Sequence, residues 1–297
     1  MDHFKRYMDI IPDFDSFTEF LSRPLPITVR INTLKIDRSR LMDRLDRAGI
    51  EHEEMGWYPL GLRLGPGIER PGKLIEHLLG YVHIQEEVSM IPPIVLDSRP
   101  GEEVLDLCAS PGSKTTHISQ IMENRGLIIA NEPSLSRVTP LRSNCERLGV
   151  LNTAITRYDG RRFPDHLFDR VLVDAPCSSE GMARKDAEMK DRCSLKRSLD
   201  LQVLQKGLLK RAVNLTKPGG VIVYSTCTYA PEENEAIVNH VLDDVRAEPV
   251  SIRGLKGSPG VTEWNGESFS DDLKLCTRYY PHHNDTGGFF VARLVRR

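Results

Sequence analysis

The sequence has few features of a membrane, secreted or metal-binding protein. No apolar run approaches the roughly 18 residues that a membrane span needs, and the first residues lack the basic start and apolar stretch of a signal peptide. The six cysteines lie 16 to 49 residues apart and form no CxxC pair, which argues against a compact zinc site and a disulfide scaffold. We therefore expect a cytoplasmic protein that holds no metal and binds no membrane.

An excess of charge of one sign is also absent. Lysine and arginine total 40 and aspartate and glutamate 42, so the net charge is −2 and any attraction to a polyanion must come from local charge. Hydrophobic residues make up 39% and charged residues 28% of the 297 residues, as in globular proteins. The length suits one large domain, or a large and a small one.

The first 75 residues predict a small α+β domain. Residues 27–34 alternate apolar and polar side chains, which is typical of a half-buried strand. A helix is expected to follow, with Asp37 as its N-cap and with Leu41 and Leu45 on its apolar side. We assign residues 1–75 to this domain.

Residues 76–297 predict an α/β domain. Strands are expected over 104–108, 127–130, 153–156, 170–173 and 220–224, and helices over 114–123, 135–148 and 199–215. Near-continuous Val, Ile and Leu strands separated by helices indicate a parallel sheet covered on both faces. Residues 289–295 are predicted to form a final edge strand.

Ligands of such sheets bind beyond the carboxyl ends of the strands, so the residues that follow each strand matter most. The first strand leads into a loop of small residues, where Ala109, Ser110 and Gly112 would let a ligand approach the backbone. The loop has neither the Walker A spacing nor G-x-G-x-x-G. A nucleoside triphosphate or a dinucleotide is therefore disfavoured.

Carboxylates follow four successive strands, at Glu132, Asp159, Asp174 and, as a borderline case, Asp106. A single aspartate at such a place is more often a cap or a turn former. Glu132 lies some 20 residues beyond the loop, where a carboxylate can accept hydrogen bonds from ribose hydroxyls. Together the four carboxylates predict a pocket for a small nucleoside-like ligand.

Two cysteines occupy matching places at the ends of neighbouring strands. Cys177 follows the strand over 170–173, and Cys227 follows the strand over 220–224. We expect Cys227 to lie beside a helix N-terminus, which would favour its thiolate, whereas Pro231 and the acidic residues after it also fit ordinary helix-start chemistry. Two thiols that face one pocket indicate covalent chemistry rather than packing.

Four ordered motifs resemble those of the Nop/Sun family of RNA cytosine-5 methyltransferases. They are DLCASPGSKT at 106–115, DAPCSSEG at 174–181, STCTYAPEENE at 225–235, and YPHH at 280–283 followed by GFF at 288–290, and RINTLK at 30–35 also looks like the N-terminal part of the family. The resemblance implies a Rossmann-like methyltransferase with a mostly parallel seven-stranded sheet and an antiparallel last strand. It also implies S-adenosylmethionine as methyl donor and cytosine in RNA as acceptor.

The resemblance also assigns roles to single residues. Cys227 would be the nucleophile, Cys177 would help to release the product, and Asp174 would border both cofactor and base. The residues that would bind S-adenosylmethionine are Cys108, Ala109, Ser110, Pro111, Gly112, Ser113, Lys114, Glu132, Arg137, Asp159 and Asp174. The family often has Gly or Ala where this chain has Ser110, Ser113 and Ser179, and Asp where it has Glu132.

The chemistry explains why such a site needs a thiol. Cytosine C5 is a poor nucleophile, but addition of a thiolate to C6 makes C5 enamine-like, so that it can attack a methyl group. A protonated Asp174 in a water-poor pocket would donate to N3 of the base. The C5 proton must then leave so that Cys227 can be expelled, and Cys177 would assist.

An RNA substrate requires basic surface, because the target base must be single-stranded or flipped out of its stack. Residues 181–217 hold ten Lys or Arg and four acids, a local net charge of +6; the basic residues are Arg184, Lys185, Lys190, Arg192, Lys196, Arg197, Lys206, Lys210, Arg211 and Lys217. The first domain adds Arg30, Lys35, Arg38, Arg40, Arg44 and Arg47. A merely solvated helical face explains the first set equally well. We interpret the first domain as an RNA-recognition-like module, although it lacks a clear aromatic stacking pair.

Several functions remain as alternatives. Transfer RNA is favoured because the compact chain lacks a long extension for ribosomal assembly, and ribosomal RNA is the second candidate. A DNA cytosine methyltransferase also uses a proline-cysteine nucleophile, which would promote Cys177 over Cys227. The alternative outside the class of enzymes is a catalytically inactive RNA-binding assembly factor.

Overall fold

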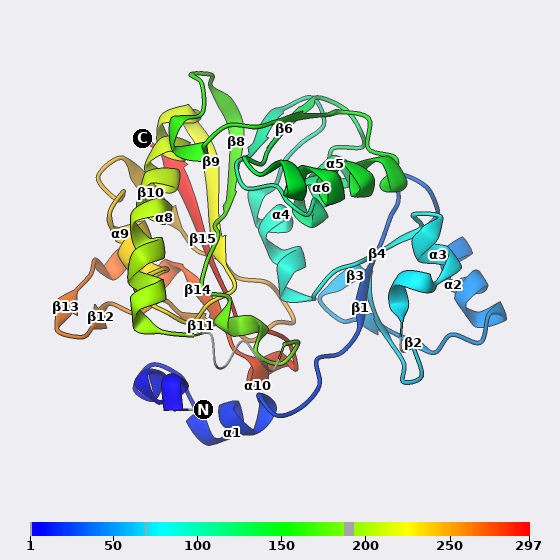
Figure 1. Ribbon diagram of the computed structural model, residues 1–297, viewed down its shortest axis with the longest axis horizontal. Coiled ribbons are helices and arrows are strands. Elements are labelled where there is room, and N and C mark those ends of the chain that lie inside the picture. The colour runs from blue at the N-terminus through cyan, green and yellow to red at the C-terminus, as the bar shows by residue number, and fades with distance from the viewer. Residues whose placement is uncertain (1, 69, 187–192) are drawn as a thin grey trace.

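The structure is a computed structural model that describes residues 2–68, 70–186 and 193–297 (Figure 1). Its larger unit is built on a nine-stranded sheet. The strands are β5 (Glu103–Asp106), β6 (Leu127–Asn131), β7 (Thr153–Thr156), β8 (Phe168–Asp174), β9 (Thr216–Thr226), β10 (Val245–Glu248), β11 (Ser258–Pro259), β14 (Thr277–Tyr279) and β15 (Phe289–Arg296). They lie in the order β11-β14-β15-β9-β8-β5-β6-β7, with β10 paired to β15.

The predicted sheet is confirmed in its main features. β5 pairs in parallel with β6 and β8, the outer pairs β6–β7 and β8–β9 are also parallel, and β15 runs antiparallel to β9. Seven strands from β14 to β7 form the predicted seven-stranded core, and the short β10 and β11 extend it. The expectation of a final edge strand is wrong, because β15 lies between β9 and β14 and residues 289–292 are buried.

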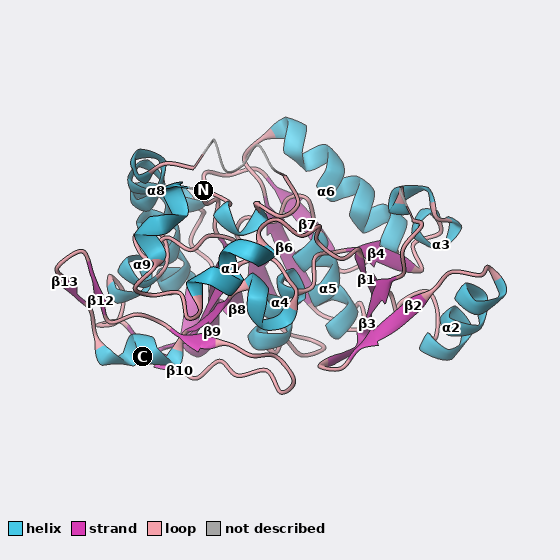
Figure 2. Cartoon of the chain, turned by 90° about the horizontal axis from the view of Figure 1, so that it is seen from below, coloured by secondary structure: helices cyan, strands magenta, loops and turns pink. Residues whose placement is uncertain are grey.

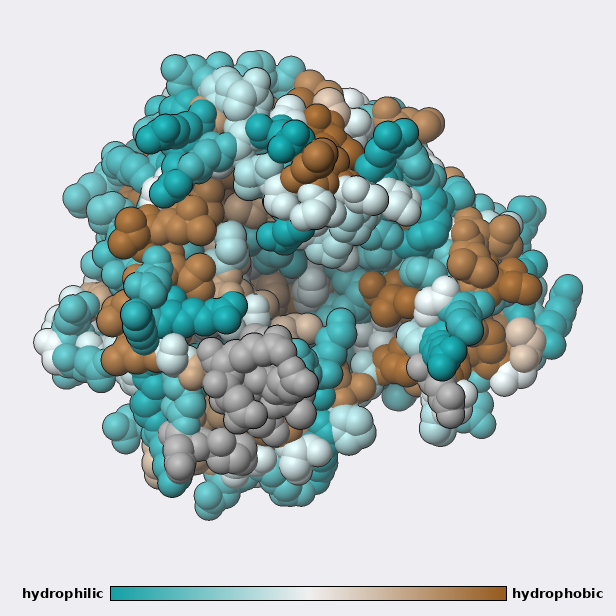
Figure 3. Space-filling view, viewed as in Figure 1, coloured by the Kyte–Doolittle hydropathy of each residue, from teal (hydrophilic) through white to brown (hydrophobic). Residues whose placement is uncertain are grey.

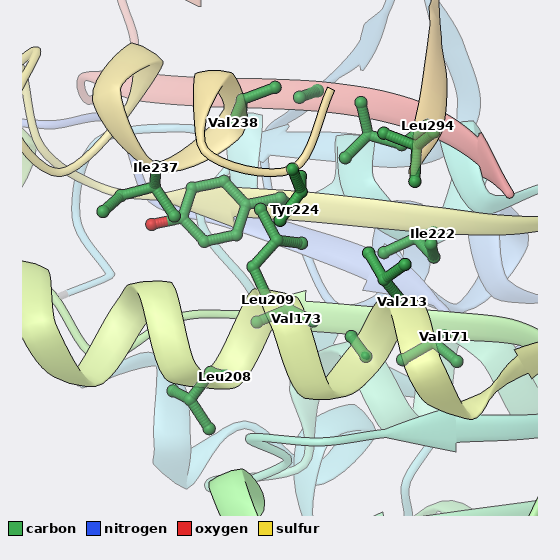
Figure 4. Close-up of a cluster of buried hydrophobic side chains, with 14 of the residues drawn as sticks. Val171, Val173, Leu208, Leu209, Val213, Ile222, Tyr224, Ile237, Val238 and Leu294 are labelled. Carbon is green, nitrogen blue, oxygen red and sulfur yellow. The ribbon is translucent and has the colours of Figure 1, made fainter. Parts of the chain in front are cut away.

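Helices cover both faces of this sheet. One layer contains α8 (Leu195–Leu215) and α9 (Glu235–Asn239), and the other contains α4 (Ile91–Leu96), α5 (Ser113–Ile121) and α6 (Leu135–Leu148). Successive residues of β8 alternate between the layers, with Val171 and Val173 facing α8 and Leu172 facing α4 and α5. Figure 4 shows part of the first layer, where the ring of Tyr224 lies beside Ile237.

The smaller unit has the β-α-β-β-α-β order of ferredoxin-like domains. Its elements are β1 (Thr28–Ile31), α2 (Arg38–Arg47), β2 (His52–Met55), β3 (Tyr58–Leu64), α3 (Ile75–Leu78) and β4 (Val82–Ile84), and its antiparallel strands lie in the order β2-β3-β1-β4. Asp37 is the N-cap residue of α2, and Leu41 and Leu45 are buried as predicted. The Asp37 side chain itself makes no capping hydrogen bond.

The first strand of this unit is not half-buried as predicted, because all four of its residues are buried. Val29 and Ile31 pack with the apolar side of α2. On the opposite face, the guanidinium of Arg30 donates to Gln120 and, at 3.0 Å, to Thr116 of α5. The sheet face that an RNA-recognition module would offer to RNA therefore packs on the larger unit. The prediction that Arg30 belongs to an RNA-binding surface is wrong, because its side chain is buried in this contact.

The domain boundary after residue 75 stays a prediction. β4 lies beyond that residue and pairs with β1 in the small sheet, whereas the first elements of the chain, η1 (Asp2–Tyr7) and α1 (Phe14–Phe20), pack on the larger unit. Figure 2 shows α1 in front of the large sheet, and the ring of Phe17 meets that of Tyr229. Within the described ranges, no helix has both the length and the apolar character to cross a membrane.

Candidate active site

Two adjoining cavities lie beyond the carboxyl ends of the parallel strands. The smaller, of about 250 Å³, lies between the loop after β5, the ends of β6 and β7, and α8. The larger, of about 490 Å³, lies between the same loop, the start of β15 and the end of β4. The face shown in Figure 3 is hollowed between the two units. Cys108, Ser110, Asp174, Ala175 and Cys227 line both cavities.

The predicted cofactor residues are divided between the cavities. Those that line the smaller one are Cys108, Ser110, Glu132, Arg137, Asp159 and Asp174, and those that line the larger one are Cys108, Ala109, Ser110, Pro111, Ser113, Lys114 and Asp174. Gly112 lines neither of the two; it is the N-cap of α5 with φ of 101°, and a Cβ there would lie 3.0 Å from Leu141. The loop after β5 thus forms the wall between the cavities.

Two carboxylates border the smaller cavity as predicted. Glu132 is buried, accepts a hydrogen bond from the Ser134 amide at 2.9 Å, and lies 3.5 Å from the Arg137 guanidinium. Asp159 pairs with Arg161, whose hydrogen bonds lower the pKa of the Asp159 carboxyl to about 2. An acidic wall of this kind suits a ligand that carries hydroxyl and amino groups.

The fourth predicted carboxylate differs from the others. Asp106 is 1% exposed and accepts a hydrogen bond from Thr115 at 2.6 Å. It borders the larger cavity and not the smaller one. Burial raises the pKa of Asp106 to about 7. Asp106 therefore stabilises the loop after β5 through Thr115. It does not line the smaller cavity beside Glu132 and Asp159.

Asp174 forms an ion pair at the junction of the cavities. One carboxylate oxygen lies 2.6 Å from the Lys114 ammonium and the other accepts from Ser225 at 2.8 Å. The hypothesis of a protonated Asp174 stays a prediction, and the Lys114 ammonium is a second hydrogen-bond donor at the junction of the cavities. Sequence reasoning missed this pairing because 60 residues separate the two.

The two predicted cysteines meet at the same junction. Their sulfur atoms lie 3.3 Å apart, and both side chains are partly buried. A hydrogen bond from the Cys177 thiol lowers the pKa of Cys227 and raises that of Cys177, and the Ser179 hydroxyl and the Lys114 ammonium also lower the pKa of Cys227. Cys227 lines both cavities, whereas Cys177 lines the smaller one. Cys227 is therefore the better placed nucleophile of the two.

The expectation that a helix N-terminus lies beside Cys227 is wrong. Helix α9 begins at Glu235, and Pro231 precedes it outside any helix. The acids of this segment are not a solvated helix start either, because Glu233 and Glu235 are fully buried. Glu233 accepts from the Ser178 amide at 2.9 Å, and Glu235 pairs with Arg278. The hydrogen bond from the Cys177 thiol, and not a helix dipole, lowers the pKa of Cys227.

The structure places the predicted basic residues in different surroundings. Lys190 and Arg192 lie outside the described residues. Arg184 is buried and pairs with Asp285 at 2.6 Å, whereas Lys185 lines the larger cavity. In the smaller unit, a separate groove of about 550 Å³ is lined by Lys35, Arg40, Arg44 and Arg47, together with Asp37, Asp43 and Tyr81.

Family models match both units. A model described as 16S rRNA methyltransferase RsmB/F matches residues 93–295, and a model described as an RsmF/B-like ferredoxin-like domain matches residues 11–69. The chain is 42% identical to a tRNA (cytosine(49)-C(5))-methyltransferase of Pyrococcus abyssi, over 96% of this chain and 92% of the relative. It is 38% identical to ribosomal RNA small subunit methyltransferase F of Vibrio atlanticus and 37% identical to a human 28S rRNA (cytosine(4447)-C(5))-methyltransferase. The chain spans 62% of the Vibrio relative and 37% of the human one, which match 99% and 98% of this chain.

Solved structures agree with these relatives. A methyltransferase homologue from Pyrococcus horikoshii has a TM-score of 0.87 and 34% identity, over 99% of this chain and 94% of that one. NSun6 from Pyrococcus horikoshii, solved with SFG, has a TM-score of 0.86 and 25% identity, over 99% of this chain and 96% of that one.

Proposed function

We propose, from the premise that this chain belongs to the RsmB/F family of RNA cytosine-C5 methyltransferases, that Cys227 bonds covalently to C6 of a cytosine in RNA while S-adenosylmethionine donates a methyl group to C5. This is the Nop/Sun family that the motifs indicate. The observation that carries the covalent step is the 3.3 Å separation of two thiols, one of which faces both cavities.

The smaller cavity is the proposed site of S-adenosylmethionine. Its residues fit a nucleoside, because Glu132 can accept from ribose hydroxyls and Leu204 and Leu208 offer an apolar surface to a base. Similarity to NSun6, solved with the S-adenosylmethionine analogue SFG, supports the assignment. When bound, the cofactor supplies an electrophilic methyl group. Arg137 and Asp159 border the same cavity and are proposed as further contacts.

The larger cavity is the proposed site of the cytosine. The Asp174 carboxylate would accept from the N4 amino group, a contact that uracil cannot offer. As the Cys227 thiolate adds to C6, the electrons of the C5–C6 double bond move toward N3 and the carbonyl, where the Lys114 ammonium donates a proton. C5 then attacks the methyl group. Once Cys227 is bonded to C6, the Cys177 thiol would lose its proton to solvent, and the resulting thiolate would take the C5 proton. The C5–C6 double bond then re-forms as the Cys227 thiolate leaves, and N3 returns its proton to Lys114.

Transfer RNA is the proposed substrate. The relative that this chain matches over 92% of its length is named a tRNA methyltransferase, whereas the chain spans only 37% to 62% of the two relatives named for ribosomal RNA. The paired thiols work in the reduced form, so we place the enzyme in a reducing compartment such as the cytoplasm. Because the small sheet is covered, the RNA contacts of residues 1–75 are proposed to lie in the groove beside α2.

Trapping on RNA that contains 5-fluorocytosine tests the covalent step. Release of the enzyme requires loss of the proton on C5, and 5-fluorocytosine carries fluorine in its place. The parent enzyme should therefore remain attached to the RNA in the presence of S-adenosylmethionine. Cys227→Ala should abolish the adduct, whereas Cys177→Ala should still form it, and should also accumulate it on ordinary cytosine. Loss of the adduct with Cys177→Ala but not with Cys227→Ala would assign the nucleophile as in DNA cytosine methyltransferases.

Two measurements separate the remaining alternatives. Calorimetry should detect binding of S-adenosylmethionine, and methyl transfer to total cellular RNA should follow. Binding without transfer to any RNA pool would instead identify an inactive assembly factor. Bisulfite sequencing of RNA from cells with and without the gene should show the lost 5-methylcytosine in transfer RNA, and its loss from ribosomal RNA would reassign the substrate.

A further inference from the structure

A buried carboxylate lies behind the two cysteines and outside both cavities. Glu180 belongs to the short turn η5 (Glu180–Met182), three residues after Cys177, and its side chain is fully buried. An ionised carboxylate without solvent is costly unless hydrogen bonds and charges compensate it. The hydrogen-bond partners of Glu180 therefore indicate its structural role.

One set of partners comes from the first turn of the chain, more than 170 residues away. The Tyr7 hydroxyl lies 3.0 Å and 2.8 Å from the two oxygens of Glu180, and the imidazole of His3 lies 2.6 Å from one of them. Tyr7 is itself fully buried. The turn η1 thus closes the pocket that holds the carboxylate.

The other set comes from the loop that carries Cys227. The Thr228 hydroxyl lies 3.1 Å from Glu180, and it also lies 2.7 Å from the hydroxyl of Ser178. Because a hydroxyl has one proton, the chain of donors runs from Ser178 through Thr228 to the carboxylate. Ser178 and Thr228 are the residues that directly follow Cys177 and Cys227.

This arrangement couples the two cysteine loops. Beside the hydroxyl pair, the Gly181 amide donates to the Cys227 carbonyl at 2.9 Å, so the loops are joined on both sides of Glu180. The separation of the two sulfur atoms follows from how these loops lie against each other. Catalytic groups lose about two orders of magnitude in rate when they are displaced by about 1 Å.

We propose that Glu180 is a positioning residue, which acts through Thr228 and Ser178 to hold Cys177 against Cys227, and that Tyr7 and His3 of the first turn complete its site. The inference rests on the proposed function, because it needs both thiols to take part in the reaction. It gives the start of the chain a role in the chemistry and not only in packing.

Single hydroxyl deletions test the proposal in the full-length protein. Thr228→Val removes the link between the loops, and Tyr7→Phe removes the support from the first turn. Both should lower kcat about tenfold or more, while the KM for RNA and the Kd for S-adenosylmethionine stay within about twofold, because neither residue lines either of the two cavities at the proposed site. Thr228→Ser keeps the hydroxyl and should restore kcat.

Tyr280→Phe is the matched control. Its hydroxyl also ties the first segment to the larger unit, through the Ile10 carbonyl at 3.1 Å, but it does not touch Glu180. This variant should keep the parent kcat. A kcat within about twofold of the parent in a folded Thr228→Val protein, or an equal loss in Tyr7→Phe and Tyr280→Phe, would overturn the proposal.

The reactivity of Cys227 gives a second readout that does not depend on turnover. Displacement of Cys177 should remove its hydrogen bond to Cys227, so alkylation of Cys227 by iodoacetamide in Thr228→Val should need a higher pH than in the parent. An unchanged pH dependence would contradict the proposal. Glu180→Gln should behave like Thr228→Val, and if it fails to fold the two hydroxyl variants still decide.

Two further controls distinguish the positioning role from a metal site and from a failure of the proposed function. The atoms of His3, Glu180 and Cys193 that could bind a metal lie within 4.8 Å of one another. If chelation by EDTA reproduces the loss seen in Tyr7→Phe, the cluster is a metal site and the positioning role is wrong. If the parent forms no adduct on 5-fluorocytosine RNA, the proposed function fails; if it does and the variants match the parent, only this inference fails.

Discussion

The two cysteines of the site have the same side chain but opposite chemistry. Cys227 accepts a hydrogen bond from Cys177, which lowers the pKa of the first thiol and raises that of the second. The contact therefore favours a thiolate at Cys227 and a thiol at Cys177. In the proposed mechanism the thiolate of Cys227 adds to C6, and once that sulfur is bonded to carbon, Cys177 loses the partner that kept its proton in place. This one contact would therefore set the order of the two proposed steps.

Asp106 allows a test of burial at the residue scale. Its pKa is about 7 in the folded protein, well above the ordinary range near 4, because the carboxyl is buried. Between these values the folded protein holds a proton that the unfolded chain has released, so the free energy of unfolding falls as the pH rises through this window, by on the order of 4 kcal/mol for this group. Asp106→Asn should remove that part of the pH dependence.

Urea unfolding at pH 5 and at pH 8 measures the contribution of Asp106 to the pH dependence of the free energy of unfolding. The stability of the parent should fall between the two pH values by about 2–3 kcal/mol more than that of Asp106→Asn, with the variant at least as stable as the parent at pH 8. The amide oxygen still accepts from Thr115, so the loop after β5 keeps its support. Equal losses in the two proteins would mean that the Asp106 carboxyl is not protonated in this window.

At the scale of elements, close backbone approach shapes the floor of the larger cavity. The Gly181 amide donates to the Cys227 carbonyl and its own carbonyl accepts from the Gly288 amide, so η5 lies between the cysteine loop and the start of β15. A Cβ at position 181 would lie 2.1 Å from the Gly288 carbonyl oxygen. No side chain fits there without moving one of these backbones.

Gly181→Ala should therefore destabilise the protein by about 1–3 kcal/mol and should lower methyl transfer more than binding of S-adenosylmethionine, because the shifted loop carries Cys177. Gly72→Ala is the matched control, since a Cβ at that position meets no atom of the described residues within 4 Å beyond its chain neighbours. Chemical unfolding and single-turnover methylation compare the two variants. Equal stability of Gly181→Ala and Gly72→Ala would show that η5 and the start of β15 can move apart without loss of stability.

Local sequence patterns predicted elements well where local chemistry decides. The helix over 135–148 has the observed bounds of α6, since its apolar side and the left-handed Gly149 are both encoded locally. The burial of β1 and the interior place of β15 were missed, because each depends on a second surface that is distant in sequence. The ion pair of Lys114 with Asp174 and the network of Glu180 were missed for the same reason. The motifs indicated the residues of the proposed site, and the fold determined what each one faces.

At the scale of the whole molecule, the net charge of −2 gives no general attraction to RNA. Binding must then come from the placement of single cations. The small sheet cannot contribute its face, which is occupied by α5, so its outer side remains. There Arg40 and Arg47 of α2 line the 550 Å³ groove, and Arg44 lies over the ring of Tyr81 at 5.4 Å.

Replacement of Arg40 and Arg47 by Gln should therefore weaken RNA binding without touching the chemistry. Each phosphate contact that is lost lowers the slope of log K against log salt by about 0.7 to 0.9, so the double variant should show a slope smaller by up to about 1.8. The rate within the bound complex and the Kd for S-adenosylmethionine should match the parent, because the groove is separate from both cavities. Arg246→Gln, on the exposed side of β10, is the control and should leave the slope unchanged. An unaltered salt dependence in the double variant would mean that the RNA reaches Cys227 along α8 and Lys185 instead, and that the small unit serves only to cover α5.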